Sequence, residues 1–295
     1  MRIKVMSEGG LGNQLFQASF AHYLSQGIPN CEIFFVNDNS NSDRTFFLNN
    51  FFQNCSHVQE SKSRLQFGRN RHELNLSLTR KFPFFKDKRY SRRLIKENDT
   101  TSDFMLYFNQ LVVSSHPKEF LIRGYFQNWT YHFMSSECFL SCLRDALKLN
   151  ARIVNESKFA CVHIRRGDYW RFSSHGPLSD QFYINQVWRI KDRVSKLVVH
   201  SDDILAVNNL GMLPIGVSNY SLSGNAWDLL ADASQAAFFI GSNSSLSWWA
   251  AFAHDHLGKF GNAQITFPSE WYRGVPTQTL SIIPNHWELV KVDWA

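Results

Sequence analysis

The chain begins with a short apolar run, a glycine-rich turn and apolar residues at helical spacing. The run covers residues 3–6, the turn covers residues 9–12, and the helical spacing extends from Phe16 to Leu24. A second apolar run at residues 31–36 predicts a buried strand. The chain therefore starts as strand, turn, helix and strand.

The same alternation returns after an irregular middle region. Residues 40–118 are basic and have no clear period, whereas residues 119–126 predict a strand and an amphipathic helix ends near Asn150. Residues 159–164 are apolar on both faces, as in a parallel strand that helices cover on both sides. The remaining predicted elements are helices at about 180–195, 226–236 and 243–257 and strands at 197–200, 212–217 and 237–240.

This alternation of strands and helices predicts an α/β protein with two Rossmann-like, doubly wound domains that face each other across a ligand cleft. The halves meet near residues 150–158, so we expect an N-terminal domain over residues 1–152 and a C-terminal domain over residues 153–295. Ligands of such folds bind at the carboxyl ends of the strands. Residues directly after the predicted strands are therefore the candidates for binding.

The positive charge of the chain is concentrated in one segment. The formal net charge of +6 arises from residues 62–96, where 12 Lys and Arg residues face two acidic residues. This segment is either a solvated surface or a peripheral contact with anionic lipid. Because no recognised nucleic-acid motif accompanies it, we expect no nucleic-acid partner.

Cysteine content and the first residues indicate a reducing compartment. The five cysteines are an odd number at irregular spacing, which favours buried, reduced thiols over disulfides. Residues 1–5 contain no secretory signal, and no stretch approaches the roughly 20 apolar residues of a membrane span. We therefore expect a cytoplasmic protein that can contact the inner face of the membrane.

Two arginines form the first chemical motif. Arg165 and Arg166 directly follow the predicted strand at 159–164, and Asp168 comes two residues later. Paired guanidinium groups at the carboxyl edge of a sheet suit a diphosphate, and they could neutralise a pyrophosphate leaving group without a metal. Asp168 would order the arginines or act as a base. A surface salt-bridge cluster is the alternative interpretation.

The second motif, FFIGSNSS at residues 238–245, predicts a strand, a glycine turn and a helix start. Free N–H groups and hydroxyls at such a helix start bind phosphate. Ser242 or Asn243 would cap the helix, and capping and anion binding can share one helix end. Trp248 and Trp249 could stack on a ring, but Trp249 follows the helical spacing and is expected in the core.

The third motif, GGLGNQ at residues 9–14, matches the dinucleotide-binding pattern only in part. Leu15 stands where the third glycine belongs, which makes a nicotinamide cofactor a weak hypothesis. Asn13 and Gln14 at an exposed helix start are better suited to hydrogen bonds with a sugar or phosphate.

Metal-binding motifs are missing from the sequence. It contains no His-Glu-x-x-His, no paired Cys-x-x-Cys and no Asp-x-Asp. Asp202 and Asp203 are adjacent, so they would point to opposite faces of an extended segment. We therefore expect no metal and no other cofactor.

Together the motifs resemble the α-1,2-fucosyltransferases of glycosyltransferase family 11, especially the bacterial ones. The matching segments are residues 9–17 (GGLGNQLFQ), 124–127 (GYFQ), 163–169 (HIRRGDY), 201–203 (SDD) and 228–251 (DLLADASQAAFFIGSNSSLSWWAA). The resemblance implies a GT-B fold and metal-free, inverting transfer of L-fucose from GDP-β-L-fucose to the 2-hydroxyl of a galactose-terminated acceptor. It also implies a bacterial enzyme that makes part of a surface polysaccharide such as O-antigen.

The resemblance also implies roles for individual residues. The N-terminal domain would lie on the acceptor side, and the C-terminal domain would bind GDP-fucose. Arg165 and Arg166 would hold the diphosphate, with Arg165 the more exposed. Asp228 would bind guanine through its carboxylate, and Asn13 would lie near the reacting centre. The implied donor contacts are Gly12, Asn13, Arg165, Arg166, Asp228, Ser244 and Ser245.

The sequence leaves the catalytic base open. Related fucosyltransferase families place a glutamate shortly after the arginine pair, but residues 169–173 contain none. The candidates are Asp168, His163 and His175, in that order.

Acceptor choice and oligomeric state also stay open, and residues 40–118 with their loops would select the acceptor. A non-catalytic glycan-binding protein at the membrane surface is the alternative function. It would bind glycan without releasing GDP.

Overall fold

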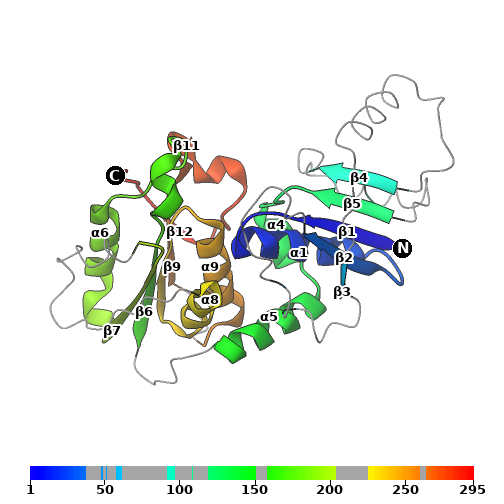
Figure 1. Ribbon diagram of the computed structural model, residues 1–295. Coiled ribbons are helices and arrows are strands. Elements are labelled where there is room, and N and C mark those ends of the chain that lie inside the picture. Colours follow the sequence, from blue (N-terminus) through cyan, green and yellow to red (C-terminus); the bar gives the residue numbers. More distant parts are fainter. Residues whose placement is uncertain are drawn as a thin grey trace.

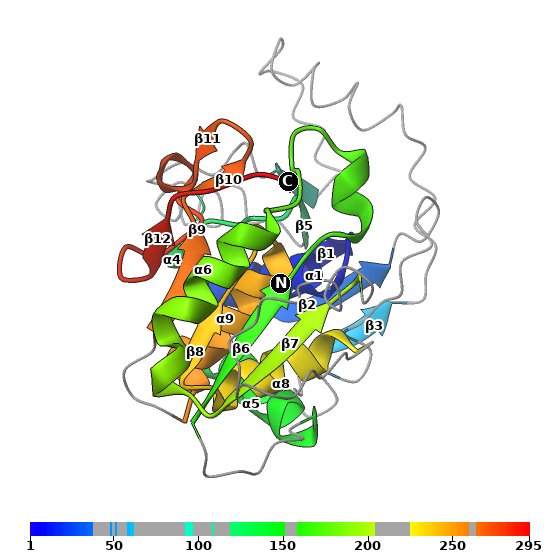
Figure 2. The ribbon, with the colours of Figure 1, turned by 90° about the vertical axis from the view of Figure 1, so that its left-hand side faces the viewer.

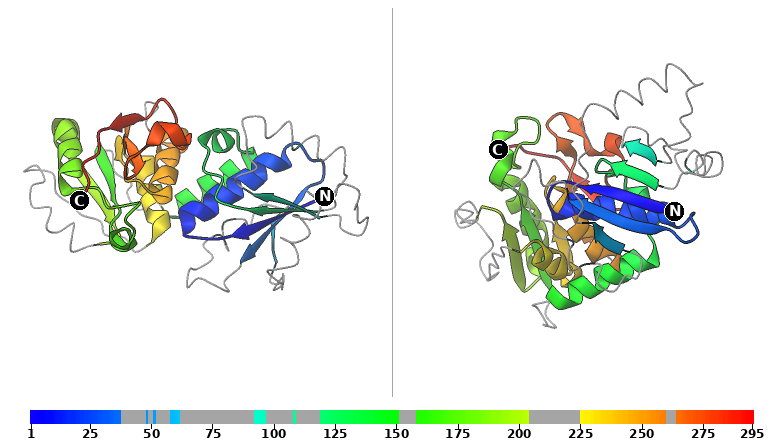
Figure 3. Two further views of the ribbon diagram at one scale, coloured as in Figure 1. Left: turned by 90° about the horizontal axis from the view of Figure 1, so that it is seen from above. Right: turned by 45° about the vertical axis from the view of Figure 1, so that its right-hand side comes forward.

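The computed structural model describes residues 1–37, 48, 51, 58–61, 92–96, 108, 119–150, 158–203, 225–259 and 264–295. Within these residues most strands gather into two parallel sheets, with helices between and around them (Figure 1). One sheet is built from strands before residue 124 and the other from strands after residue 158. Seen from above, the two halves lie side by side along the molecule (Figure 3). The two-sheet α/β architecture that the sequence predicts is confirmed.

The N-terminal sheet has the order β3-β2-β1-β5-β4 among the described strands, and all neighbouring pairs are parallel. In the central strand β1, Ile3 pairs with Ile33 of β2 and with Phe120 of β5. The strands predicted at 3–6 and 31–36 are therefore present. The strands are β1 (Arg2–Ser7), β2 (Glu32–Asn37), β3 (Val58–Ser61), β4 (Arg92–Lys96) and β5 (Glu119–Arg123).

Strand β5 is shorter than the strand that the sequence predicts at 119–126. It ends at Arg123 because Gly124 has a φ of 140° and Phe126 a φ of 55°, and neither angle fits a β-strand. Residues 124–127 form a turn instead. The turn is fixed to the first helix, since the Nε2 of Gln17 donates to the carbonyl of Gly124 at 3.0 Å.

Two helices of the N-terminal half, α1 and α5, form where the apolar spacing predicts them, and the short helix α4 is not predicted. Phe16 and Phe20 of helix α1 (Leu11–Ser25) are completely buried. Helix α4 (Trp129–Phe133) follows the turn after β5, and α5 (Glu137–Asn150) is the predicted amphipathic helix that ends near residue 150. These helices cover the side of the N-terminal half that faces the second sheet (Figure 1).

The C-terminal sheet has the order β12-β9-β8-β6-β7 among the described strands, again with parallel neighbours. The sequence predicts β6, β7 and β8. It does not predict β9 and β12, and the strand expected at 212–217 lies outside the described residues. The strands are β6 (Phe159–Ile164), β7 (Lys196–Ser201), β8 (Phe238–Ile240), β9 (Gln264–Pro268) and β12 (Glu288–Val290).

Helices cover both faces of this sheet, which explains why β6 is buried along its whole length. Helix α6 (Asp180–Ile190) lies on one face, and α8 (Ala226–Gln235) and α9 (Ser245–Leu257) lie on the other (Figure 2). Helix α6 ends before the predicted residue 195 because a separate turn, η3 (Lys191–Arg193), follows it. Further short elements are η2 (Gly167–Arg171), β10 (Glu270–Tyr272), β11 (Val275–Pro276) and η4 (Thr277–Leu280).

The two halves share an apolar core to which α1, α5, α8 and α9 contribute. The ring of Phe16 lies 4.7 Å from the ring of Trp248 and 5.2 Å from that of Trp249. Both tryptophans are fully buried, so Trp249 lies in the core as predicted and neither ring faces a ligand. The expected domain boundary between residues 152 and 153 lies outside the described residues.

Three further expectations concern cysteines, the membrane and the basic segment. The four described cysteines, Cys31, Cys138, Cys142 and Cys161, are free thiols. In the part of the chain that the structure describes, none of the helices has the length and apolar character to cross a membrane. The basic segment 62–96 lies outside the described residues except for the backbone of β4.

Candidate active site

The predicted chemistry converges on the carboxyl edge of the C-terminal sheet. Arg165 follows β6, Asp202 follows β7 and Ser242 lies in the turn after β8. Because β6 pairs with both β7 and β8 in parallel, these three strand ends lie side by side. Residues far apart in the sequence thus form one edge.

Arg165 is held by two carboxylates at this edge. Its Nη2 lies 2.6 Å from Oδ1 of Asp168, and its Nη1 lies 2.8 Å from Oδ2 of Asp202. The guanidinium carbon also lies 5.3 Å from the centre of the Tyr169 ring. The side chain stays 26% exposed, so a permanent positive charge is both fixed in place and accessible.

Arg166 points away from its neighbour. Its side chain is only 5% exposed and pairs with Asp180 at the start of α6, on the other side of the sheet edge. Its backbone N–H donates to Oδ1 of Asp202 at 2.8 Å. Of the predicted arginine pair, the structure therefore keeps Arg165 accessible and packs the guanidinium of Arg166 beneath α6.

His163 lies inside the protein and joins β6 to α9. Its Nδ1 is 2.5 Å from the Oγ of Ser247, and that oxygen also accepts the N–H of Ser242 at 3.0 Å. Burial, and to a smaller extent Arg165 and His200, lower the pKa of His163 well below its ordinary value. The imidazole is thus neutral and anchors the β6 end to the start of α9.

The start of α9 is capped by Ser244, whose Oγ accepts the N–H of Leu246 at 3.3 Å. The sequence expects Ser242 or Asn243 as the cap, and this is wrong by one or two residues. Asn243 instead ties neighbouring segments together, because its Nδ2 donates to the carbonyls of His175 at 3.2 Å and Trp271 at 3.1 Å. Ser244 and Ser245 both lie at the helix end that the sequence selects for phosphate.

Tyr169 connects Arg165 to the α9 start. Its hydroxyl donates to the carbonyl of Asn243 at 2.9 Å. Burial is the main cause that raises the pKa of Tyr169 to about 12, so the phenol stays protonated and remains a donor. The Tyr169 ring, which contacts the Arg165 guanidinium, is therefore held in place at its hydroxyl end.

The start of α1 meets the start of α9 across the interface of the two halves. A β carbon on Gly12 would lie 2.5 Å from the backbone nitrogen of Leu246, so only glycine permits this approach. Asn13 is next to this contact, and its Oδ1 accepts from Nε2 of Gln127 at 3.1 Å. Gln14 is buried and donates to the carbonyl of Gly9 at 2.9 Å, which leaves Asn13 as the accessible amide.

Asp228 lies in the first turn of α8, where its side chain is buried. Asp232, one turn further along the same helix face, pairs with His200 at 2.9 Å. The start of α8 lies at the carboxyl edge of the sheet, like that of α9. The guanine-binding role of Asp228 stays a prediction.

His175 is the remaining candidate base. Its ring is partly exposed and lies 5.3 Å from the ring of Tyr169 and 4.8 Å from that of Tyr272. Burial lowers its pKa below the ordinary value, and the nearby Asp168 carboxylate opposes this effect. At neutral pH the imidazole is neutral and can accept a proton.

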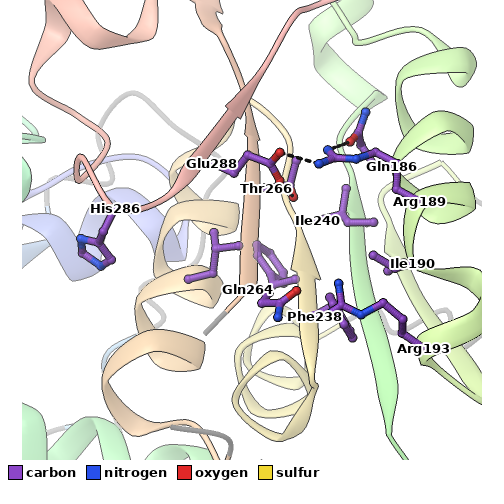
Figure 4. A pocket seen from close by; sticks show the side chains of 12 residues that line it. Gln186, Arg189, Ile190, Arg193, Phe238, Ile240, Gln264, Thr266, His286 and Glu288 are labelled. Carbon is purple, nitrogen blue, oxygen red and sulfur yellow. Dashed lines mark hydrogen bonds and ion pairs between the residues drawn. The ribbon is translucent and has the colours of Figure 1, made fainter. Parts of the chain in front are cut away.

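A cavity of about 250 Å³ lies elsewhere, between α6 and strands β8, β9 and β12 (Figure 4). Arg189 spans its mouth and pairs with Glu288. None of the residues that the sequence predicts for the site lines this cavity. Among the described residues, no group of three or more His, Cys, Asp or Glu side chains could hold a metal ion.

Comparisons with known proteins agree with this geometry. A sequence model described as Glycosyl transferase family 11 matches residues 2–258. O-antigen biosynthesis glycosyltransferase WbnK of Escherichia coli is 27% identical over 292 residues, covering 90% of this chain and 93% of that protein. Alpha-1,2-colitosyltransferase of Escherichia coli is 28% identical over 158 residues, covering 50% of this chain and 52% of that protein.

Solved structures show the same fold at low sequence identity. The Escherichia coli heptosyltransferase WaaC with ADP has a TM-score of 0.53 and 8% identity, covering 99% of this chain and 93% of that one. POFUT1 in complex with GDP has a TM-score of 0.50 and 13% identity, covering 89% of this chain and 96% of that one. The fold is GT-B, as expected from the resemblance.

Proposed function

The chain belongs to glycosyl transferase family 11, and we propose that it transfers L-fucose from GDP-β-L-fucose to the 2-hydroxyl of a terminal galactose. The reaction would invert the anomeric carbon and need no metal. Because one relative is named for O-antigen biosynthesis, we further propose that the product is part of a surface polysaccharide.

One observation supports this proposal above the others: Arg165 is held by Asp168 and Asp202 beside the start of α9. When the bond from fucose to GDP breaks, negative charge develops on the diphosphate. A fixed guanidinium and the N–H groups and hydroxyls of a helix start can stabilise that charge together. Ser244 and Ser245 would bind the diphosphate from the helix, and Arg165 would do so from β6.

We propose different roles for the charged residues. In an inverting displacement the acceptor oxygen approaches the anomeric carbon opposite the leaving group. Asp168 contacts Arg165 at 2.6 Å, so its carboxylate would position the arginine and not accept the proton. His163 is buried and would position β6 against α9. We assign the proton acceptor to His175, which is partly exposed and neutral.

Fucose transfer is tested with labelled GDP-fucose, a panel of β-galactosides and linkage analysis of the product by NMR. We expect an α-1,2-linked product at an unchanged rate in EDTA. Loss of activity that Mn²⁺ restores would refute the metal-free reaction. Because one relative is named alpha-1,2-colitosyltransferase, GDP-colitose is assayed in parallel. Transfer from that donor but not from GDP-fucose would overturn the donor assignment, and glycan binding without GDP release would favour the non-catalytic alternative.

A further inference from the structure

Two large aromatic side chains are exposed beside the candidate active site. Trp170 is 57% exposed and Phe172 is 50% exposed. Both lie in or directly after η2, the short helix that begins just behind Arg165 and Arg166. Single exposed apolar residues are common, but two aromatic rings within three residues at the edge of a polar site indicate a binding surface.

The backbone that carries these rings is fixed. The N–H of Phe172 donates to the carbonyl of Tyr169 at 3.2 Å, and the N–H of Gly176 donates to the carbonyl of Phe172 at 3.1 Å. The N–H of Arg273 in turn holds the carbonyl of Ser174 at 2.9 Å. The loop therefore presents its rings in defined positions, which lowers the entropy lost when a ligand binds.

Each ring is also supported on one side. The ring of Phe172 lies 5.9 Å from that of His175, which meets Tyr272 edge-on. The ring of Trp170 lies 6.0 Å from the guanidinium carbon of the buried Arg166. The protein thus holds part of each ring and leaves the rest accessible to a ligand.

The position of the rings relates them to the reacting sugar. Tyr169 precedes Trp170 and is bonded to the α9 start, where the donor diphosphate would bind. His175, the assigned proton acceptor, contacts Phe172. If His175 accepts the proton, a ring beside it would lie near the acceptor hydroxyl.

We propose that Trp170 and Phe172 form a stacking surface for a pyranose ring of the acceptor glycan, an inference that rests on the proposed function. The apolar C–H face of galactose packs against aromatic rings, while its hydroxyls remain free for hydrogen bonds. Acceptor recognition then includes the C-terminal half of the protein and is not confined to residues 40–118.

The test compares Trp170→Ala and Phe172→Ala with Trp188→Ala. Trp188 is 47% exposed on α6, far from the η2 loop in sequence, and therefore controls for loss of an exposed tryptophan. Initial rates are measured with lactose and N-acetyllactosamine as acceptors and saturating GDP-fucose. We expect the acceptor KM to rise about tenfold in the first two variants and to stay unchanged in the third. The KM for GDP-fucose should not change in any of them.

A second pair of variants separates ring stacking from simple apolar contact. Phe172→Trp should keep the acceptor KM of the natural protein, whereas Phe172→Leu should raise it. An acceptor KM in Trp170→Ala and Phe172→Ala equal to that of Trp188→Ala would overturn the proposal. So would an oligomeric state in these variants that differs from that of the natural protein, because the rings would then contact a second copy of the chain.

Binding measurements distinguish a failure of this proposal from a failure of the proposed function. Saturation-transfer NMR with lactose and N-acetyllactosamine reports contact between the sugar and aromatic protons without any turnover. If the natural protein transfers no fucose, the proposed function fails. Saturation transfer that is lost in Trp170→Ala and Phe172→Ala, but kept in Trp188→Ala, would still support the stacking surface. Equal transfer in all three would refute it.

Discussion

The two halves of the molecule place different chemistry at equivalent positions. Each half has a parallel sheet whose carboxyl edge is followed by a helix start, and α1 and α9 meet there. The edge of the N-terminal half carries mainly amides that bond to one another and to the backbone, together with one ion pair between Arg123 and Glu8: the amides are Asn13, Gln14, Gln17 and Gln127. The edge of the C-terminal half carries charges: Arg165, Arg166, Asp168, Asp180 and Asp202.

This difference matches the two ligands of a sugar transfer. A diphosphate leaving group carries charge that a neutral amide cannot offset, so the charged edge suits the donor. Sugar hydroxyls are neutral and both donate and accept, so amides such as Asn13 suit a sugar. The fold thus repeats while the chemistry at each sheet edge follows what that edge would bind.

The largest effect should come from removing the fixed positive charge. We expect Arg165→Ala to lower kcat by roughly 10²- to 10³-fold, because the leaving diphosphate loses its guanidinium. Arg165→Lys should recover part of the rate, since a lysine keeps the positive charge but lacks the planar guanidinium that contacts both carboxylates at once. Steady-state kinetics with GDP-fucose measure both effects, and melting temperatures show whether the fold survives.

The matched control is Arg189→Ala, which removes an exposed arginine near the C-terminal end of α6 that pairs with Glu288. Its kcat should equal that of the natural protein. If Arg165→Ala were as active as this control, Arg165 would not stabilise the departing diphosphate.

The next effect concerns the proton acceptor. We expect His175→Gln to lower kcat/KM by about 10²-fold. Because burial lowers the pKa of His175 below 6.5, the natural protein should lose activity only as the pH falls below that value and the imidazole becomes protonated. The kcat/KM of the variant should not show this decrease at low pH.

A pH series of kcat/KM for both proteins is the measurement. If kcat/KM of His175→Gln still decreased at low pH as in the natural protein, another group would be responsible for the titration, and His175 would not be the proton acceptor.

Much of the fold follows from apolar spacing, because long elements contain enough residues to show their period. Helix α1 and strand β6 lie where the sequence predicts them. Strand β8 has three residues that are all apolar and buried, whereas β12, Glu288–Val290, is equally short but begins with an exposed glutamate and shows no apolar run. Strand β5 stops early because of the positive φ at Phe126, which only the folded turn reveals.

The site was predictable in part for a similar reason. Arg165 and the start of α9 follow from strand ends, but the contact between Arg165 and Asp202 depends on β6 pairing with β7. The divergence of Arg165 and Arg166 could have been predicted, because neighbours on an extended segment point to opposite sides.

The smallest effect should come from the amides of the N-terminal edge. Asn13→Ala removes the amide that accepts from Gln127 and, in our proposal, lies near the reacting sugar. We expect kcat/KM to fall roughly 3- to 10-fold, the usual effect of losing one uncharged hydrogen bond. Asn13→Asp keeps the size but adds a negative charge beside the diphosphate, so its kcat/KM should be no higher than that of Asn13→Ala.

Gln26→Ala is the control, because Gln26 is an exposed amide just beyond the far end of α1 that donates to the carbonyl of Met134. Its kinetics should equal those of the natural protein. If Asn13→Asp were instead more active than Asn13→Ala, the N-terminal edge would tolerate or use a charge. The contrast between an amide-rich edge and an arginine-rich edge would then describe only the native residues and not a requirement of the reaction.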